Sequence, residues 1–225
     1  MKRAILDELN LAKARKETTV LLTNLKNGEQ ELIYPLRSDV KHPLLDDLKT
    51  AIRDDKSYVH VTENEETFIQ VFNPPLRLII VGAVHISQFL VPMAQSVGYE
   101  VILIDPRSAF GNKTRFPNCE ITNEWPDEAM EDLKPDHRTA VVLLTHDPKL
   151  DDPALEASLQ SDAFYIGALG SKRTHAKRLD RLSSLNNLKR IEGPIGLDIG
   201  AKNPAEIAVS ILASITKFLR HGDKK

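Results

Sequence analysis

One glycine limits the folds open to this chain more than any other residue. Residues 78–81 are all apolar, Gly82 follows at once, and a helix-like pattern begins at Ile86. A second apolar run, residues 101–104, follows that pattern and ends at Asp105. The order of strand, glycine turn, helix, strand and acid is typical of a βαβ unit that binds a dinucleotide. The sequence therefore predicts an α/β fold with a Rossmann-like, mostly parallel sheet.

The glycine fingerprint of such units is incomplete in this chain. The pattern asks for glycine at three positions, and the residues there are Gly82, Val84 and Ser87. A branched valine at the middle position crowds the place where a pyrophosphate meets the backbone. The turn could hold a phosphate-bearing ligand in a shifted position, or it could join a strand to a helix and bind nothing. Both interpretations stay open.

Composition indicates a globular protein with a sizeable core. Of its 225 residues, 41% are hydrophobic and 28% are charged. The net charge of −2 argues against nucleic acid or a membrane surface as a partner. We expect a cytoplasmic location, because neither an apolar signal core nor a membrane span is visible. Cys119 is the only cysteine, which excludes an intrachain disulfide and a thiolate metal cluster built by one chain.

A domain boundary is predicted at Asn73-Pro74-Pro75, which can continue neither a sheet nor a helix. We expect a small N-terminal α+β domain over residues 1–73 and a Rossmann-like domain over residues 76–225. In the first domain, Asn27-Gly28 predicts a β-hairpin with a type I′ turn. A second hairpin is expected from residues 58–61 and 67–72.

The second domain alternates strand and helix patterns. The predicted strands are 78–81, 101–105, 119–122, 140–145, 164–166 and 195–198. The predicted helices are 86–97, 126–133, 153–160, 171–185 and 204–220. Residues 106–118 lack a helical pattern, so we expect a long loop in place of the second crossover helix. Long loops in compact domains are often functional.

The candidate binding residues follow the predicted strands, because ligands of doubly wound sheets lie beyond the carboxyl ends of the strands. They are Gly82, Ala83, Val84, His85, Asp105, Arg107, Thr145, His146, Gly167, Gly170, Ser171, Lys172, Arg173 and Asp198. We assign no catalytic residue and no metal ligand.

The charged candidates each have more than one interpretation. Asp105 could bond a ribose diol and Arg107 could pair with a phosphate, or the two could form a salt bridge within a loop. His146 and Asp147 could act as an acid–base pair or as two ligands for a metal, although neighbours at a strand end point in different directions. Alternatively, Asp147 before Pro148 could only start a turn. Lys172 and Arg173 open a predicted helix, where the dipole disfavours cations unless an anion lies between them. They could bind an anion or an acidic partner, or they could be a solvated helix start.

Six sequence phrases suggest a family. They are V-G-A-V-H (81–85), I-D-P-R (104–107), R-F-P (115–117), L-T-H-D (144–147), Y-I-G-A-L-G-S-K-R (165–173) and G-P-I-G-L-D-I-G-A-K-N-P-A-E-I-A-V-S-I-L (193–212). Together they resemble the XdhC/CoxI family of accessory proteins for molybdenum hydroxylases. The resemblance implies a Rossmann-type C-terminal domain. It also implies that the protein protects the molybdenum cofactor, aids its sulfuration and delivers it to xanthine dehydrogenase or a relative.

The chain departs from that family in two places. Many members have G-A-G-H where this chain has Gly82-Ala83-Val84-His85. Their N-terminal domain often carries a glycine- and serine-rich motif that ends in a cysteine, and no such motif precedes Asn73. Roles tied to that motif are therefore not carried over to this chain.

Three functions are compatible with the sequence. The first is a carrier that binds molybdenum cofactor (molybdopterin) and inserts it into a xanthine dehydrogenase-like hydroxylase. The second is an NAD(P)-dependent oxidoreductase, with Asp105 on the ribose and His146 as the acid. The third is a non-catalytic interaction module. We favour the carrier, because the sequence offers no convincing nucleophile–base pair. A sulfurtransferase partner and a homodimer are left open, and neither nucleic acid nor membrane is expected as a partner.

Overall fold

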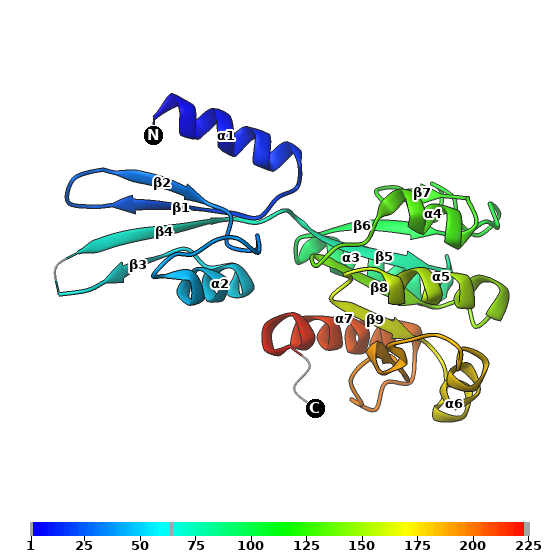
Figure 1. The fold of residues 1–225 in the computed structure, drawn as a ribbon. Helices are drawn as coiled ribbons and strands as arrows, with labels where there is room; N and C mark the ends of the chain where they lie inside the picture. Colours follow the sequence, from blue (N-terminus) through cyan, green and yellow to red (C-terminus); the bar gives the residue numbers. More distant parts are fainter. Residues whose placement is uncertain (1, 64, 223–225) are drawn as a thin grey trace. The chain divides into compact units, whose positions relative to one another are not determined.

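The computed structural model describes residues 2–63 and 65–222. The chain divides into two compact units, Met1–Pro74 and Pro75–Lys225 (Figure 1). Each unit has its own sheet. No helix within the described residues is long and apolar enough to cross a membrane.

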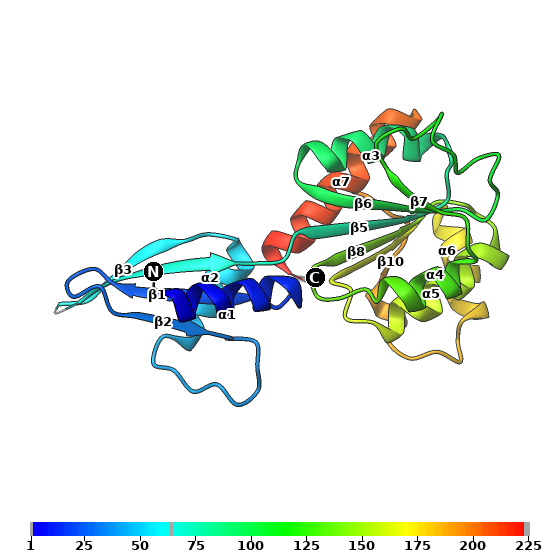
Figure 2. The same cartoon turned by 90° about the horizontal axis from the view of Figure 1, so that it is seen from above.

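The first unit is a four-stranded antiparallel sheet with two helices. Its elements are α1 (Arg3–Ala14), β1 (Thr19–Asn24), β2 (Gln30–Ile33), α2 (Leu45–Asp54), β3 (Tyr58–Val61) and β4 (Glu66–Phe72). The strand order is β2-β1-β4-β3, so both predicted hairpins are confirmed. The apolar side of α2 packs on the sheet face that carries Val20, Leu22 and Ile69. Helix α1 lies over the other face, where Lys13 is above the Phe72 ring (Figures 1 and 2).

The turn of the first hairpin differs from the prediction. A type I′ turn needs a positive φ at both central residues, whereas only Gly28 has one, at +73°. The side chain of Asn24 accepts hydrogen bonds from the N–H groups of Lys26 and Asn27, and its carbonyl accepts from Gly28 N at 2.8 Å. This asparagine therefore organises a longer loop between the two strands, and the type I′ prediction is wrong.

The second unit alternates strands and helices around a six-stranded parallel sheet. Its elements are β5 (Leu76–Val81), α3 (His85–Ser96), β6 (Tyr99–Ile104), β7 (Glu120–Thr122), α4 (Pro126–Leu133), β8 (Thr139–Leu143), α5 (Pro148–Gln160), β9 (Tyr165–Ala168), α6 (Lys172–Arg181), a 3₁₀ turn (Leu188–Arg190), β10 (Ile191–Glu192) and α7 (Pro204–His221). The strand order is β10-β9-β8-β5-β6-β7, and every pairing is parallel. The predicted Rossmann-like α/β fold is confirmed.

Helices cover both faces of this sheet (Figure 2). Leu78 and Ile80 of β5 pack with α3 and α7, whereas Ile79 and Val81 pack with α4 and α5. Successive residues of β5 point to opposite faces, and all six are buried. A strand that is buried on both faces favours a continuous apolar run, and residues 78–81 are such a run, which is why this segment stood out in the sequence. Arg77, in the same strand, is buried as well, and its side chain donates to Leu133 O and Lys134 O.

One predicted strand of the second unit is wrong, and one predicted helix begins earlier than expected. Residues 195–198 form no strand, because Gly196 has a φ of +94° and Leu197 N donates to Ser210 O on α7. The sixth strand is instead the short β10. Helix α5 begins at Pro148 rather than Pro153, because the side chain of Asp147 accepts from Lys149 N and caps the helix.

Candidate functional site

The order of the strands gives the parallel sheet a topological switch point. From β5 the chain moves outward to β6 and β7, then returns to β8 on the other side of β5. The switch in direction lies between β5 and β8, and ligands of such sheets bind outside the carboxyl ends of the strands at this point. The candidate site is therefore built from the segments that follow β5, β6, β8 and β9.

Gly82 directly follows β5, at a point where no side chain fits. Its φ is +113°, and a Cβ there would lie 2.7 Å from Thr145 Cγ2 and 3.2 Å from Thr145 N. The turn is held from two sides, since Gly82 N donates to Ile104 O at 2.8 Å and Ser87 Oγ donates to Gly82 O at 2.5 Å. The ends of β5 and β8 thus approach closely only because this residue is glycine.

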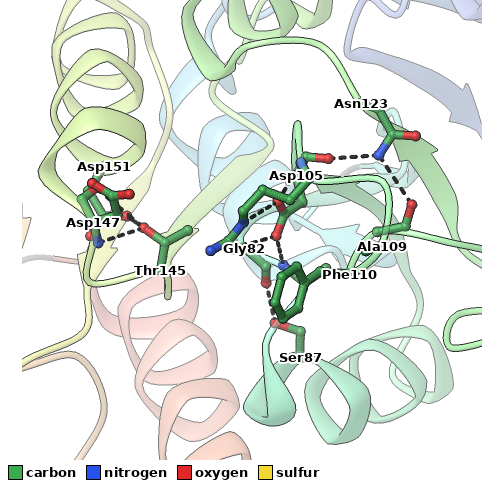
Figure 3. Close-up of polar contacts among 12 residues, drawn as sticks. Gly82, Ser87, Asp105, Ala109, Phe110, Asn123, Thr145, Asp147 and Asp151 are labelled. Atoms are coloured by element: carbon green, nitrogen blue, oxygen red, sulfur yellow. Dashed lines mark hydrogen bonds and ion pairs between the residues drawn. The ribbon is translucent and has the colours of Figure 1, made fainter.

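Asp105 lies at the end of β6 and is fully buried. Its Oδ2 accepts from Ala83 N and from Arg107 Nη2, both at 2.8 Å. Its Oδ1 accepts from Arg107 N at 3.0 Å and from Arg107 Nε at 2.8 Å (Figure 3). An ionised carboxylate has about four acceptor positions, and all are occupied here. Asp105 therefore fixes the glycine turn and the arginine together.

The ionisation of Asp105 follows from these contacts. Burial by itself raises the pKa of a carboxyl group, yet the hydrogen bonds from Arg107 and from the N–H of Ala83 outweigh it. The pKa of Asp105 consequently stays below its ordinary value, and the side chain is a carboxylate at neutral pH. Its partner Arg107 keeps 38% of its side chain exposed.

The loop between β6 and β7 is well anchored, and the predicted absence of a helix there is confirmed. Arg115 Nη1 donates to Ala83 O at 2.7 Å and to Phe110 O at 2.8 Å. Asn123 Nδ2 donates to Asp105 O at 2.7 Å and to Gly111 O at 3.1 Å (Figure 3). Sequence reasoning assigned no role to Arg115 or Asn123, although R-F-P was among the family phrases.

The end of β8 is organised by Thr145. Its Oγ1 donates to Asp151 Oδ1 at 2.6 Å and accepts from Asp147 N at 3.0 Å (Figure 3). Because the side chain of Asp147 caps α5, it serves that helix and not His146. His146 is exposed and has a φ of +61°, a left-handed conformation that histidine adopts in turns more readily than most residues.

A buried ion pair links the ends of β8 and β9. Arg178 of α6 and Asp151 of α5 are each 2% exposed, with 3.7 Å between Nη2 and Oδ2. Arg178 Nη2 also donates to Leu169 O at 2.8 Å. Burial raises the pKa of Asp151 and lowers that of Arg178. Neither residue was singled out in the sequence, where both resemble charges on solvated helices.

Not all of the remaining candidate residues lie beyond the carboxyl ends of the strands. Gly167 is buried inside β9, where a Cβ would lie 2.6 Å from Ile195 Cδ1, so the absence of a side chain makes room for Ile195. Ser171 caps α6 by accepting from Thr174 N at 3.1 Å. The next two residues, Lys172 and Arg173, are exposed and have no ion-pair partner among the residues that the structure describes.

The other predicted residues of these segments lie in turns and loops. Gly170, with a φ of +141°, forms the turn from β9 into α6. Asp198 is exposed in the loop between β10 and α7. Val84, whose backbone is extended, occupies the N-cap position of α3, and His85 begins that helix with its ring 5.4 Å from the Phe89 ring.

A separate hollow of about 580 Å³ lies on the sheet of the first unit. Polar side chains line it, including Glu31, whose Oε2 is 3.9 Å from His42 Nε2. No candidate residue from the sequence lies there, and it has neither the strand ends nor the fixed arginine of the second unit. No group of three or more His, Cys, Asp or Glu side chains suited to a metal ion occurs in the described part of the chain.

Comparison with known proteins gives the relatives of this chain. The model of the XdhC Rossmann domain matches residues 78–215. A protein of Bacillus subtilis (strain 168), named as a probable subunit of xanthine dehydrogenase, is 32% identical over 157 residues, which cover 69% of this chain and 47% of that protein. The molybdenum cofactor insertion chaperone PaoD of Escherichia coli (strain K12) is 31% identical over 157 residues, covering 68% of this chain and 43% of PaoD.

The chain thus spans less than half the length of these two relatives. A solved structure, described as a xanthine dehydrogenase from Bacillus halodurans, is 25% identical with a TM-score of 0.72. The similarity covers 99% of this chain and 66% of that one. The resemblance seen in the sequence phrases is confirmed, and the chain belongs to the XdhC family.

Proposed function

We propose that the second unit holds the molybdenum cofactor at the carboxyl edge of its sheet and delivers it to a xanthine dehydrogenase-like hydroxylase, the client enzyme. The relative PaoD is named for insertion of this cofactor. The family match to residues 78–215 falls within the unit that contains the candidate site.

One observation carries the proposal, namely a fixed arginine beside the switch point of the sheet. Asp105 holds Nε and Nη2 of Arg107, so Nη1 is directed away from the carboxylate. Molybdenum cofactor is a pterin that bears a phosphate, and a guanidinium held in one orientation is well suited to phosphate. The donor groups at this edge therefore fit the anionic part of the cofactor.

The same contacts disfavour a nicotinamide dinucleotide. In dinucleotide-binding folds the acid at the end of the second strand accepts from the ribose hydroxyls. Here the four acceptor positions of Asp105 are occupied by Ala83 and Arg107. A ribose would have to displace an arginine from a buried carboxylate. Val84, at the middle fingerprint position, adds a branched side chain to the turn.

Sulfuration of the cofactor would need a thiol from another protein. Cys119, the one cysteine of the chain, is 1% exposed, and burial raises its pKa to about 11. A protonated, buried thiol is a poor sulfur carrier, because the thiolate is the reactive form. The proposal therefore makes this chain a holder of the cofactor and leaves any sulfur transfer to a sulfurtransferase partner.

Transfer of the cofactor to the client enzyme tests the proposal and the role of Lys172 and Arg173 at the start of α6. Two cations at the N-terminus of α6 oppose the helix dipole unless an anion compensates them. The double change Lys172→Ala, Arg173→Ala should therefore raise the melting temperature by about 2 °C. It should also lower the rate at which the cofactor-loaded protein activates the apo-hydroxylase by about tenfold, and added salt should slow the wild type more than the variant.

A matched control removes the same charge elsewhere. The double change Lys177→Ala, Lys189→Ala takes two exposed lysines from the same unit and should leave activation within about twofold of the wild type. If both double variants activate the client equally well, Lys172 and Arg173 are a solvated helix start. If the loaded wild-type protein activates no better than free cofactor, the delivery function is refuted.

A further inference from the structure

An exposed aromatic ring lies in the loop that carries the fixed arginine. Phe110 is 46% exposed, although its backbone is tightly held. Its N–H donates to Arg107 O at 2.8 Å, and its carbonyl accepts from Arg115 Nη1 at 2.8 Å. A Cβ on the next residue, Gly111, would lie 3.1 Å from Asn123 Nδ2, so the chain has no free space there. The loop thus presents a large apolar ring to solvent on a rigid support.

The ring lies beside the glycine turn and under a guanidinium. Arg115 Nη1 bridges the carbonyls of Phe110 and Ala83. Phe110 therefore lies next to Gly82, which follows β5 (Figure 3). The Cζ atom of Arg107 is 4.7 Å from the centre of the Phe110 ring. The plane of this guanidinium is set by its two bonds to Asp105. A ring and a planar cation are therefore held together at the switch point of the sheet.

We propose that Phe110 and Arg107 form a stacking platform for a flat nitrogen heterocycle that carries an anionic group. The heterocycle would stack on the exposed phenyl ring, and its anionic group would reach Nη1 of the arginine. Aromatic rings and guanidinium planes are the surfaces on which nitrogen heterocycles commonly stack in proteins. The inference rests on the proposed function, because a pterin with a phosphate is such a ligand. A purine nucleotide shares this chemistry.

Two substitutions at Phe110 distinguish the effect of an aromatic face from the effect of apolar side-chain volume. Phe110→Leu keeps an apolar side chain and removes the aromatic face, whereas Phe110→Trp keeps an aromatic face. With pterin-6-carboxylate as a fluorescent probe, we expect the leucine variant to bind at least about tenfold more weakly, since stacking contributes an affinity of this order. The tryptophan variant should bind within about threefold of the wild type. Inorganic pyrophosphate, which has no ring to stack, should bind all three proteins alike.

Trp125 provides a matched control. It is 51% exposed at the N-cap of α4, so Trp125→Leu also removes an exposed aromatic ring from this unit. We expect this change to leave the affinity for pterin-6-carboxylate unaltered. Circular dichroism and thermal unfolding should be the same for the wild type and every variant, because both rings contribute little packing.

The outcomes separate the platform from the proposed function. Equal binding of pterin-6-carboxylate by Phe110→Leu and the wild type would overturn the platform, as would a failure of the wild type to bind either this probe or AMP. Binding of AMP alone, with a loss in Phe110→Leu, would support the platform and refute a pterin cargo. If Phe110→Leu purified from cofactor-producing cells retains as much cofactor as the wild type, the platform falls while the carrier function stands.

Discussion

Replacing Gly82 with alanine is expected to lower the free energy of unfolding of the second unit by about 3 kcal/mol or more. Alanine would have to adopt a φ of +113°, and its Cβ would meet Thr145 Cγ2 at 2.7 Å and the backbone of Thr145 at 3.2 Å. The backbone of β8 cannot retreat without breaking its pairing with β5. Urea unfolding followed by the fluorescence of Trp125, the one tryptophan and a member of the second unit, measures the loss.

A second glycine separates the two causes of this loss. Gly98 has a φ of +94°, yet nothing lies within 4 Å of the position of a Cβ there. Gly98→Ala therefore carries the backbone strain without the clash, and it should cost about 1–2 kcal/mol. If the two variants lose equal stability, the close approach of Thr145 to Gly82 contributes nothing and the packing of these strand ends needs another explanation.

Replacing Asp105, which is fully buried, with asparagine should lower the free energy of unfolding by about 3 kcal/mol. The change leaves the guanidinium of Arg107 without its counter-charge. The amide keeps the shape of the side chain but points an N–H group toward other donors. The partial exposure of Arg107, 38% of its side chain, keeps the loss at the lower end of the range for buried pairs. Urea unfolding at pH 7, again followed by Trp125, gives the value.

The pH dependence of this loss has a defined sign. The pKa of Asp105 is held below its ordinary value by Arg107 and the backbone, despite burial. The pKa of an aspartate in the unfolded chain is about 3.9. Above that pH, the depressed pKa of Asp105 adds to the stability of the folded state. This added stability is lost as the pH falls through the pKa of Asp105 in the folded state. The difference between wild type and Asp105→Asn should therefore shrink below about pH 4. A difference that grows toward low pH would contradict the ion pair.

An exposed pair supplies the control for Asp105→Asn. Arg181 bonds Asp152 in the same bidentate way, at 2.8 Å for both contacts, but 42% and 22% of these side chains are exposed. Asp152→Asn should cost less than about 1 kcal/mol, because solvent screens such pairs. A similar cost at both positions would mean that burial of Asp105 does not strengthen its contacts.

The fold could be predicted from local patterns because its central strands are buried on both faces. The apolar runs that became β5, β6 and β8 can be recognised without any knowledge of their neighbours. The last strand could not be recognised this way. Residues 195–198 have the better strand composition. Ile195 N does donate to Ala168 O at the end of β9, but Leu197 N turns to Ser210 O on α7, and the short β10 forms the ladder with β9 instead.

The sequence places the candidate site at the ends of the strands, but it does not predict the contacts among the residues there. Asp105 and Arg107 were placed together, with a ribose contact and a salt bridge left as alternatives. Only the folded structure shows that the carboxylate has no acceptor position left. Gly167 was chosen as a candidate because a glycine near a strand end suggests a ligand. In the structure, the absence of its side chain makes room for Ile195. Arg115 and Arg178 act through backbone carbonyls, which leave no trace in a sequence.

Native mass spectrometry of the protein purified from cells that make molybdenum cofactor would reveal what the second unit holds. We expect a mass increment equal to molybdenum cofactor or its dinucleotide form, released on denaturation. The increment should be reduced in Arg107→Met, which removes the guanidinium from the edge of the sheet. A chain with NAD(P) bound, or with no small molecule under conditions in which the cofactor is abundant, would contradict the carrier function.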